Sequence, residues 1–290
     1  MNAQRDLDGQ IEEVERHLDP SHPATTVMDT SRHFSGAVHQ ELRARRRQAV
    51  VKAVIALVAI LAIPRLAGDM ATRSAGWCWN WLGNIDPNGT YLWVSLHHVW
   101  QLVATLAAML LFDRSLRHWG FNLNNWRTSL YLFGQFFLYF MAVAVAGHLL
   151  LFFFAPPPVF PHALTARNVF GELGFKLFLS GTCEEPLFRG LVMVLVYQSM
   201  RGVVRIGRIE MPYAGLVATA LFMVAHIGYT LSPPAITSFS IPQQIEALVL
   251  GLFYAYIFHR TRSLLGPILV HNYVNFSLTA LGMLWALLRG

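Results

Sequence analysis

Long apolar stretches separated by short polar segments make up most of the chain from residue 50 onward. They cover Val50–Leu66, Tyr91–Phe112, Leu130–Phe154, Val169–Met200, Tyr213–Thr230, Ile245–Phe258 and Leu264–Leu288. A helix needs about 20 mainly apolar residues to cross the hydrocarbon core of a bilayer. The pattern therefore predicts an all-α fold, a polytopic bundle of transmembrane helices.

Two of these stretches leave the predicted number of helices between seven and eight. The fourth, Val169–Met200, is too long for one untilted span, and it contains Ser180, Gly181 and Pro186. Proline removes a backbone donor and clashes with the preceding turn, so we expect a break in this helix that opens onto a polar cavity. The last stretch is either one tilted helix or two short ones.

The residues before the first apolar stretch have a different character. Residues 1–47 hold much of the charge, and only Ile11, Val14 and Leu18 suggest a weak amphipathic helix. We expect a mobile, solvated tail at residues 1–47 and the first two membrane spans at residues 48–121. Residues 122–290 form a third part, which holds the polar motifs described below.

Composition and charge support a membrane protein. Hydrophobic residues make up 54% of the chain and charged residues 13%, and the mean hydropathy is +0.43. The net charge of +6 comes from short basic clusters rather than from one basic face, which argues against a nucleic-acid partner. The bilayer is the expected partner instead.

The basic clusters also predict an orientation. Arginines precede the first stretch and recur in every second loop, at Arg43–Arg47, Arg114–Arg127, Arg201–Arg208 and Arg260–Arg262. Because basic loops stay in the cytoplasm, we expect the N-terminus on that side. The short loops favour a bacterial inner membrane as the location of this multi-pass protein.

Polar chemistry is concentrated in Cys183–Gly190, a charged octet within the fourth stretch. A carboxylate near the middle of a bilayer costs about 2.5 to 3.5 kcal/mol, so Glu184 and Glu185 need partners or a catalytic task. Glu185 and Arg189 stand four residues apart and can form an ion pair on one helix face. Glu184 is then free to act as a general base.

Two further motifs lie on other apolar stretches. Phe222 and His226 share a helix face in the fifth stretch, and His271 and Asn275 do so in the seventh. A water molecule held between Glu184 and His226 could attack a peptide carbonyl. His271 and Asn275 could then donate hydrogen bonds to the developing oxyanion. The structural alternative is a helix-stabilising ion pair with hydrogen-bonded, buried histidines.

The other polar residues of the spans are assigned simpler roles. His97, His98 and His148 are interpreted as structural or cavity-lining rather than metal-binding. Glu172 and Lys176, four residues apart, are expected to neutralise each other.

Together, the three motifs resemble the signature of a known family. Glu184-Glu185-x-x-x-Arg189, Phe222-x-x-x-His226 and His271-x-x-x-Asn275 are similar to motifs of the CAAX proteases and bacteriocin-processing enzymes, the CPBP or Abi family. That family includes the type II CAAX prenyl endopeptidases. The resemblance covers residues 122–288.

The resemblance implies an intramembrane endopeptidase of the glutamic type. Glu184, assisted by His226, would activate water, and His271 and Asn275 would complete the catalytic site. The supporting residues would be Glu185, Arg189 and Phe222. The implied substrate is a membrane-associated protein or peptide, which in this family can carry a prenyl lipid.

Three alternatives remain open at this point. Glu184, His226 and His271 are side chains that zinc accepts, but the H-E-x-x-H helix of zinc proteases is absent, so we favour a mechanism without a cofactor. The chain could instead be a non-catalytic bacteriocin-immunity or scaffold protein. A transporter with polar residues along its path is the third alternative.

Overall fold

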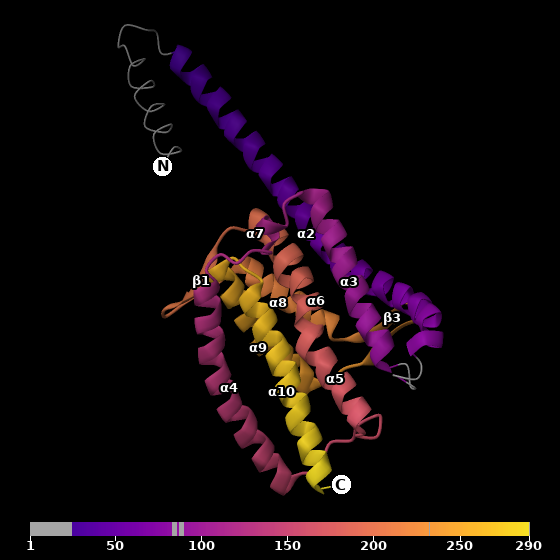
Figure 1. Cartoon of the computed structure of the whole chain (residues 1–290). Helices are drawn as coiled ribbons and strands as arrows, with labels where there is room; N and C mark the ends of the chain where they lie inside the picture. The colour runs from indigo at the N-terminus through magenta and orange to yellow at the C-terminus, as the bar shows by residue number, and fades with distance from the viewer. Residues whose placement is uncertain (1–24, 83–85, 87–89, 232, 290) are drawn as a thin grey trace. The chain divides into compact units, whose positions relative to one another are not determined.

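A computed structural model describes residues 25–82, 86, 90–231 and 233–289 (Figure 1). The chain divides into two compact units, Met1–Gln48 and Ala49–Gly290. The described part of the first unit, residues 25–48, is helical and forms the start of α2 (Thr25–Leu82). Ile11, Val14 and Leu18 lie outside the described residues, and the mobility of the tail stays a prediction.

The second unit is a bundle of helices, as the sequence predicts. After α2 come the helices α3 (Thr90–Phe112), α4 (Trp126–Phe154), α5 (Ala166–Phe178), α6 (Ser180–Glu185), η2 (Pro186–Val192), α7 (Met193–Ser199), α8 (Tyr213–Ala225), α9 (Ile241–Thr261) and α10 (Leu265–Arg289). A short 3-10 turn, η1 (Leu116–Trp119), precedes α4. Because α5 to α7 replace one predicted stretch and the last stretch is one helix, the described residues contain seven helical stretches.

The fourth stretch is broken where the sequence predicts a break. Leu179 separates α5 from α6, and η2 is a π-helix that begins at Pro186. Pro186 has no N–H to donate to the preceding turn, which accounts for the wider winding at this point. Every residue of η2 is buried, and it packs against α3, α7 and α8. The irregular helix η2 therefore lies in the buried interior of the bundle.

The sequence prediction is wrong about the fifth stretch and two loops. The predicted helix Tyr213–Thr230 ends at Ala225, and residues 228–231 form strand β3 (Gly228–Leu231), which pairs with β4 (Pro234–Ser238) in an antiparallel hairpin. A second hairpin joins β1 (Val203–Ile206) to β2 (Ile209–Pro212). This pairing requires glycine at 228, since a Cβ atom there would lie 2.3 Å from Ser238 Oγ.

Fewer helices than predicted are both long and apolar enough to cross a membrane. In the described residues there are four such segments, Val50–Trp79, Tyr91–Phe112, Trp126–Phe154 and Ile241–Thr261. α8 has only 13 residues, and the polar residues of α10, among them His271 and Asn275, lower its hydropathy. These four segments fit an integral membrane protein.

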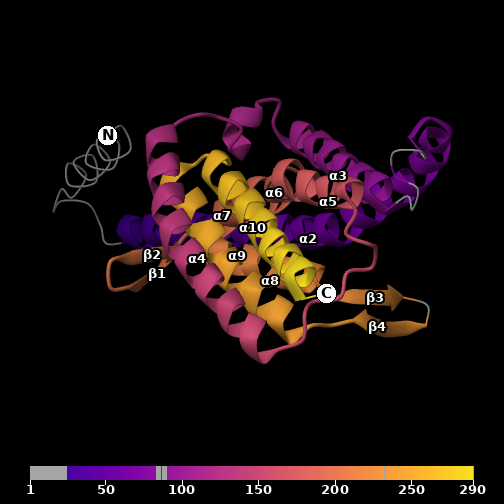
Figure 2. The same cartoon turned by 60° about the horizontal axis from the view of Figure 1, so that its bottom comes forward.

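Apolar side chains on α4 point outward over much of its length. Leu138, Val143 and Phe153 are 69%, 73% and 72% exposed. On its other face, α4 lies beside α10 (Figure 2). There Phe137 stacks on Tyr273 with ring centres 4.7 Å apart. Because such a large apolar surface is unfavourable in water, the outer face of α4 suits contact with lipid.

Close packing between α6 and α10 gives a testable prediction. A Cβ atom at Gly181 would lie 2.6 Å from His271 Cβ. Gly181→Ala should therefore destabilise the protein by about 1–3 kcal/mol, because two helix backbones must separate. Thermal unfolding in detergent measures this effect. Gly147→Ala on α4 is the matched control, since nothing lies within 4 Å of its added methyl group; equal melting temperatures for the two variants would contradict the prediction.

Candidate active site

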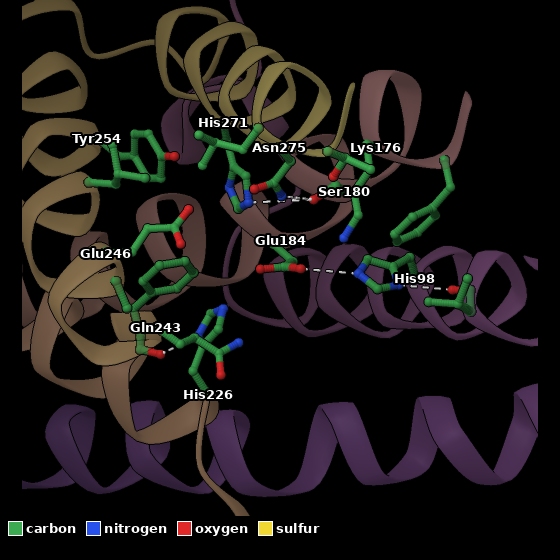
Figure 3. A pocket seen from close by; sticks show the side chains of 17 residues that line it. His98, Lys176, Ser180, Glu184, His226, Gln243, Glu246, Tyr254, His271 and Asn275 are labelled. Carbon is green, nitrogen blue, oxygen red and sulfur yellow. Dashed lines mark hydrogen bonds and ion pairs between the residues drawn. The ribbon is translucent and has the colours of Figure 1, made fainter. Parts of the chain in front are cut away.

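A cavity of about 390 Å³ lies between α3, α5, α6, α8, α9 and α10. Its lining includes all four predicted catalytic residues, Glu184, His226, His271 and Asn275 (Figure 3). Phe222 lines it as well. Glu185 and Arg189 lie behind this lining and are fully buried. Three motifs that are far apart in the sequence are therefore brought to one place, although their catalytic roles stay a prediction.

Glu184 is bonded to a histidine that none of the motifs contains. His98 on α3 places its Nε2 atom 3.0 Å from Glu184 Oε1, and the two side chains are only 12% and 18% exposed. On its other side, the ring of His98 has Nδ1 2.9 Å from the carbonyl oxygen of Val94. The ring of Phe175 packs edge-on against that of His98, with ring centres 4.7 Å apart. The ring is thus fixed in position by contacts on three sides.

His226 is the first residue after α8 and caps its C-terminal end. Its Nδ1 atom lies 2.8 Å from the carbonyl oxygen of Phe222, so Nδ1 carries the proton and donates it. Nε2 is left as an acceptor in the cavity. In Figure 3, His226 and His98 lie on opposite sides of the Glu184 carboxylate. This arrangement leaves an acceptor nitrogen and a carboxylate oxygen facing the same space.

The ring of His271 is held from both ends. Nδ1 lies 2.7 Å from Glu185 Oε1 and donates to it, while the ring stacks on Tyr254 with centres 5.1 Å apart. Nε2 lies 3.5 Å from Ser180 Oγ. A neutral His271 therefore accepts at Nε2, and it donates from this atom only when both nitrogens are protonated.

Asn275 contributes an amide group to the same wall. Its Nδ2 donates to Ser180 Oγ at 2.6 Å, which uses one of its two N–H bonds. The other N–H bond remains available to a ligand in the cavity. By contrast, Asn272 is used within the protein, because Oδ1 accepts from Gly181 N at 2.7 Å and Nδ2 donates to Thr182 Oγ1 at 3.0 Å.

Behind the cavity, Glu185 and Arg189 form the ion pair that their spacing predicts. Arg189 Nη1 lies 3.2 Å from Glu185 Oε1, and Nη2 donates to the carbonyl oxygen of Gly251 at 3.0 Å. The guanidinium also lies 4.7 Å from the ring centre of Phe222 and 5.1 Å from that of Tyr254. The pair therefore joins η2 to α8 and α9.

Several residues of the cavity were not predicted as site residues. They are His98, Lys176, Ser180, Gln243, Glu246 and Tyr254. The interpretation of His98 as cavity-lining agrees with its place, but its bond to Glu184 has no signal in the sequence, because it joins residues 86 positions apart. Lys176 pairs with Glu172 at 3.8 Å, as expected, and lines the cavity as well.

The described residues contain no arranged set of zinc ligands. Among the residues that the structure describes, no group of three His, Cys, Asp or Glu side chains is placed to hold a metal ion. Glu184, His226 and His271, which the sequence offers as zinc ligands, thus do not form such a group. The absence of a cofactor stays a prediction with its own test below.

The helical bundle and the polar cavity define a membrane protein with a buried site of glutamate, histidine and asparagine. Residues 166–277 match the family model described as type II CAAX prenyl endopeptidase Rce1-like. No curated protein and no solved structure matches the chain. The match spans all three motifs and confirms the resemblance to the CAAX proteases, although it is shorter than residues 122–288 and covers less than half of the chain. A match to a family of endopeptidases suggests a peptidase.

The buried pair gives a prediction about stability. Arg189→Met should lower the free energy of unfolding by about 3–5 kcal/mol, because it leaves the Glu185 carboxylate buried without its guanidinium partner. Glu185→Gln with Arg189→Met should cost less than the sum of the two single changes. Thermal unfolding of the four proteins in detergent measures this coupling, and additive losses would contradict it.

Proposed function

We propose that the protein is a glutamic intramembrane endopeptidase that hydrolyses a peptide bond in a membrane-associated protein or peptide. The observation that carries the proposal is the meeting of Glu184 and His226 in one cavity. Both present an unused acceptor atom, since Oε1 is bonded to His98 and His226 Nδ1 to Phe222. A water molecule between these acceptors is held by two groups that favour the loss of its proton.

The reaction then follows from the cavity's groups. Glu184 takes a proton from the water molecule, whose oxygen attacks the carbonyl carbon and forms a tetrahedral intermediate. The second N–H bond of Asn275 donates to the oxyanion, with His271 beside it. When the intermediate collapses, the carbon–nitrogen bond breaks and the proton moves from Glu184 to the leaving amine. The products are a carboxylic acid and an amine, which become a carboxylate and an ammonium when the acid loses its proton to the amine, and Glu184 is again ionised.

The surroundings of the cavity support a substrate that is bound to the membrane. α9, one of the four candidate spans, contributes a wall of the cavity, and the walls also contain apolar residues such as Val94 and Leu250. A lipid-bearing peptide can approach such a site from the bilayer. The basic loops support a cytoplasmic N-terminus, and the short loops support a bacterial inner membrane.

A second candidate function is a non-catalytic immunity or scaffold protein. The observation that favours it is that polar groups of the cavity already bond one another, Glu184 with His98 and Asn275 with Ser180. In that case the cavity would hold the helices together and carry out no reaction. Substitutions would then change stability alone.

Replacement of the proposed base separates these functions. Detergent-purified Glu184→Gln should lose cleavage of a quenched fluorescent prenylated CAAX peptide by at least about 10³-fold, because an amide cannot accept the proton. Its melting temperature should stay close to that of the wild type. Glu210→Gln is the control, since this glutamate pairs with Arg205 on a distant hairpin. Unchanged cleavage by Glu184→Gln would refute the mechanism.

A zinc chelator decides the metal question in the same assay. Cleavage by the wild type should be unaffected by the chelator, because we assign no step to a metal. Loss of cleavage with the chelator, and its return on adding zinc, would instead support the zinc-dependent variant. If a folded wild type cleaves no prenylated peptide, unprenylated membrane peptides come next, and the scaffold function gains support.

The two neighbouring asparagines should differ in their effects. Asn275→Ala should lower kcat by about 10²-fold with little change in KM, because it removes a donor to the oxyanion. Asn272→Ala should lower the melting temperature instead, since its side chain bonds Gly181 and Thr182. Steady-state kinetics and thermal unfolding of both variants test this contrast. A larger kcat loss for Asn272→Ala would contradict the assignment.

A further inference from the structure

His98 is the closest polar partner of Glu184 among the described residues, and it lies outside the segment that matches the family model. It comes from α3, and it meets α6 at a distance of 3.0 Å between Nε2 and Oε1. Nothing in the three motifs requires a histidine at this place. Its contact with the proposed base calls for a chemical explanation.

The two hydrogen bonds of His98 determine how many protons the pair holds. Because a carbonyl oxygen only accepts, the bond to Val94 requires a proton on Nδ1. The bond between Nε2 and Glu184 Oε1 then requires one further proton on either atom. With no such proton, a lone pair on Nε2 would face a carboxylate at 3.0 Å, which is repulsive. The geometry therefore fits a pair that holds one shared proton.

Two other described cations near this pair have partners of their own. Arg189 is bonded to Glu185 and to the Gly251 carbonyl, and Lys176 is paired with Glu172. The titratable groups that share the cavity with Glu184 are His98 on α3, Lys176 on α5, His226 on α8, Glu246 and Tyr254 on α9, and His271 on α10. Of these described groups, His98 alone is hydrogen-bonded to Glu184.

We propose that His98 is a positioning residue for Glu184, bound to it as an imidazolium that carries the shared proton on Nε2. The cation keeps the neighbouring carboxylate ionised in low-dielectric surroundings. It also fixes Oε1, so that the second oxygen is directed into the cavity. His98 acts through Glu184 and does not touch the substrate. The effect of His98 on catalysis rests on the proposed function, whereas the sharing of a proton between His98 and Glu184 does not.

Kinetics of His98→Gln test the catalytic consequence. Glutamine can still donate one hydrogen bond to Glu184, but it carries no charge. We expect kcat for the prenylated peptide to fall by about 10- to 100-fold with little change in KM. The acid limb of the pH–rate profile should move to higher pH by about one unit, because the carboxylate loses its cation. A purely structural residue would lower the rate without moving this limb.

The matched control is His148→Gln on α4. His148 makes the same local bond as His98, from Nδ1 to the carbonyl oxygen of Ala144 at 2.9 Å, but it does not line the cavity. This variant should keep the rate and the pH profile of the wild type. If His98→Gln keeps the wild-type pH profile as well, the positioning role is refuted.

Nitrogen NMR of histidine-labelled protein tests the shared proton without any substrate. At pH 7 the His98 signals, assigned by their loss in His98→Gln, should show both ring nitrogens protonated. In Glu184→Gln, Nε2 should lose its proton while Nδ1 keeps it. Identical His98 signals in the wild type and Glu184→Gln would overturn the proposal. If the wild type cleaves no peptide, the cleavage assay counts against the proposed function. The NMR result still decides whether His98 and Glu184 share a proton.

Discussion

The structure depends on one buried ion pair and the bonds that extend from it. Glu185 and Arg189 are both fully buried, and a charge in such surroundings costs several kcal/mol unless it is matched by an opposite charge and by hydrogen bonds. The match involves four helices, since Glu185 on α6 pairs with Arg189 on η2, His271 on α10 donates to Glu185, and the Gly251 carbonyl on α9 accepts from Arg189. Movement of any one of these helices would leave a charge without its partner.

Two neighbouring glutamates have different surroundings because successive helical residues point about 100° apart. Glu185 turns into the protein and binds Arg189, while Glu184 turns into the cavity and meets His98. Pro186 follows both and begins the π-helix. The ion pair of Glu185 thus fixes the helix α6, and α6 in turn presents the Glu184 carboxylate to the cavity. This accounts for two glutamates at adjacent positions.

Most of the fold and the motif residues could be predicted from the sequence, because both leave local signals. Apolar stretches of about 20 residues reveal the long helices, Pro186 reveals the break, and four-residue spacing reveals the pair of Glu185 and Arg189. His98 leaves no such signal, since its partner lies on a different helix. The end of α8 was missed because Gly228 and Tyr229 continue an apolar run while forming a strand. A contact between distant segments decided the first case, and the local pairing of β3 with β4 decided the second.

The short α8 has a consequence for the lipid around the protein. Its 13 residues rise about 20 Å, whereas the hydrocarbon core of a bilayer is about 30 Å thick. The hairpin that follows has strand edges with unpaired backbone groups, which are not stable in contact with lipid chains. Where α8 contacts lipid, we therefore expect the bilayer to become thinner or to admit water. His226 lies at this end of α8, so the same deformation would shorten the path by which water reaches the cavity.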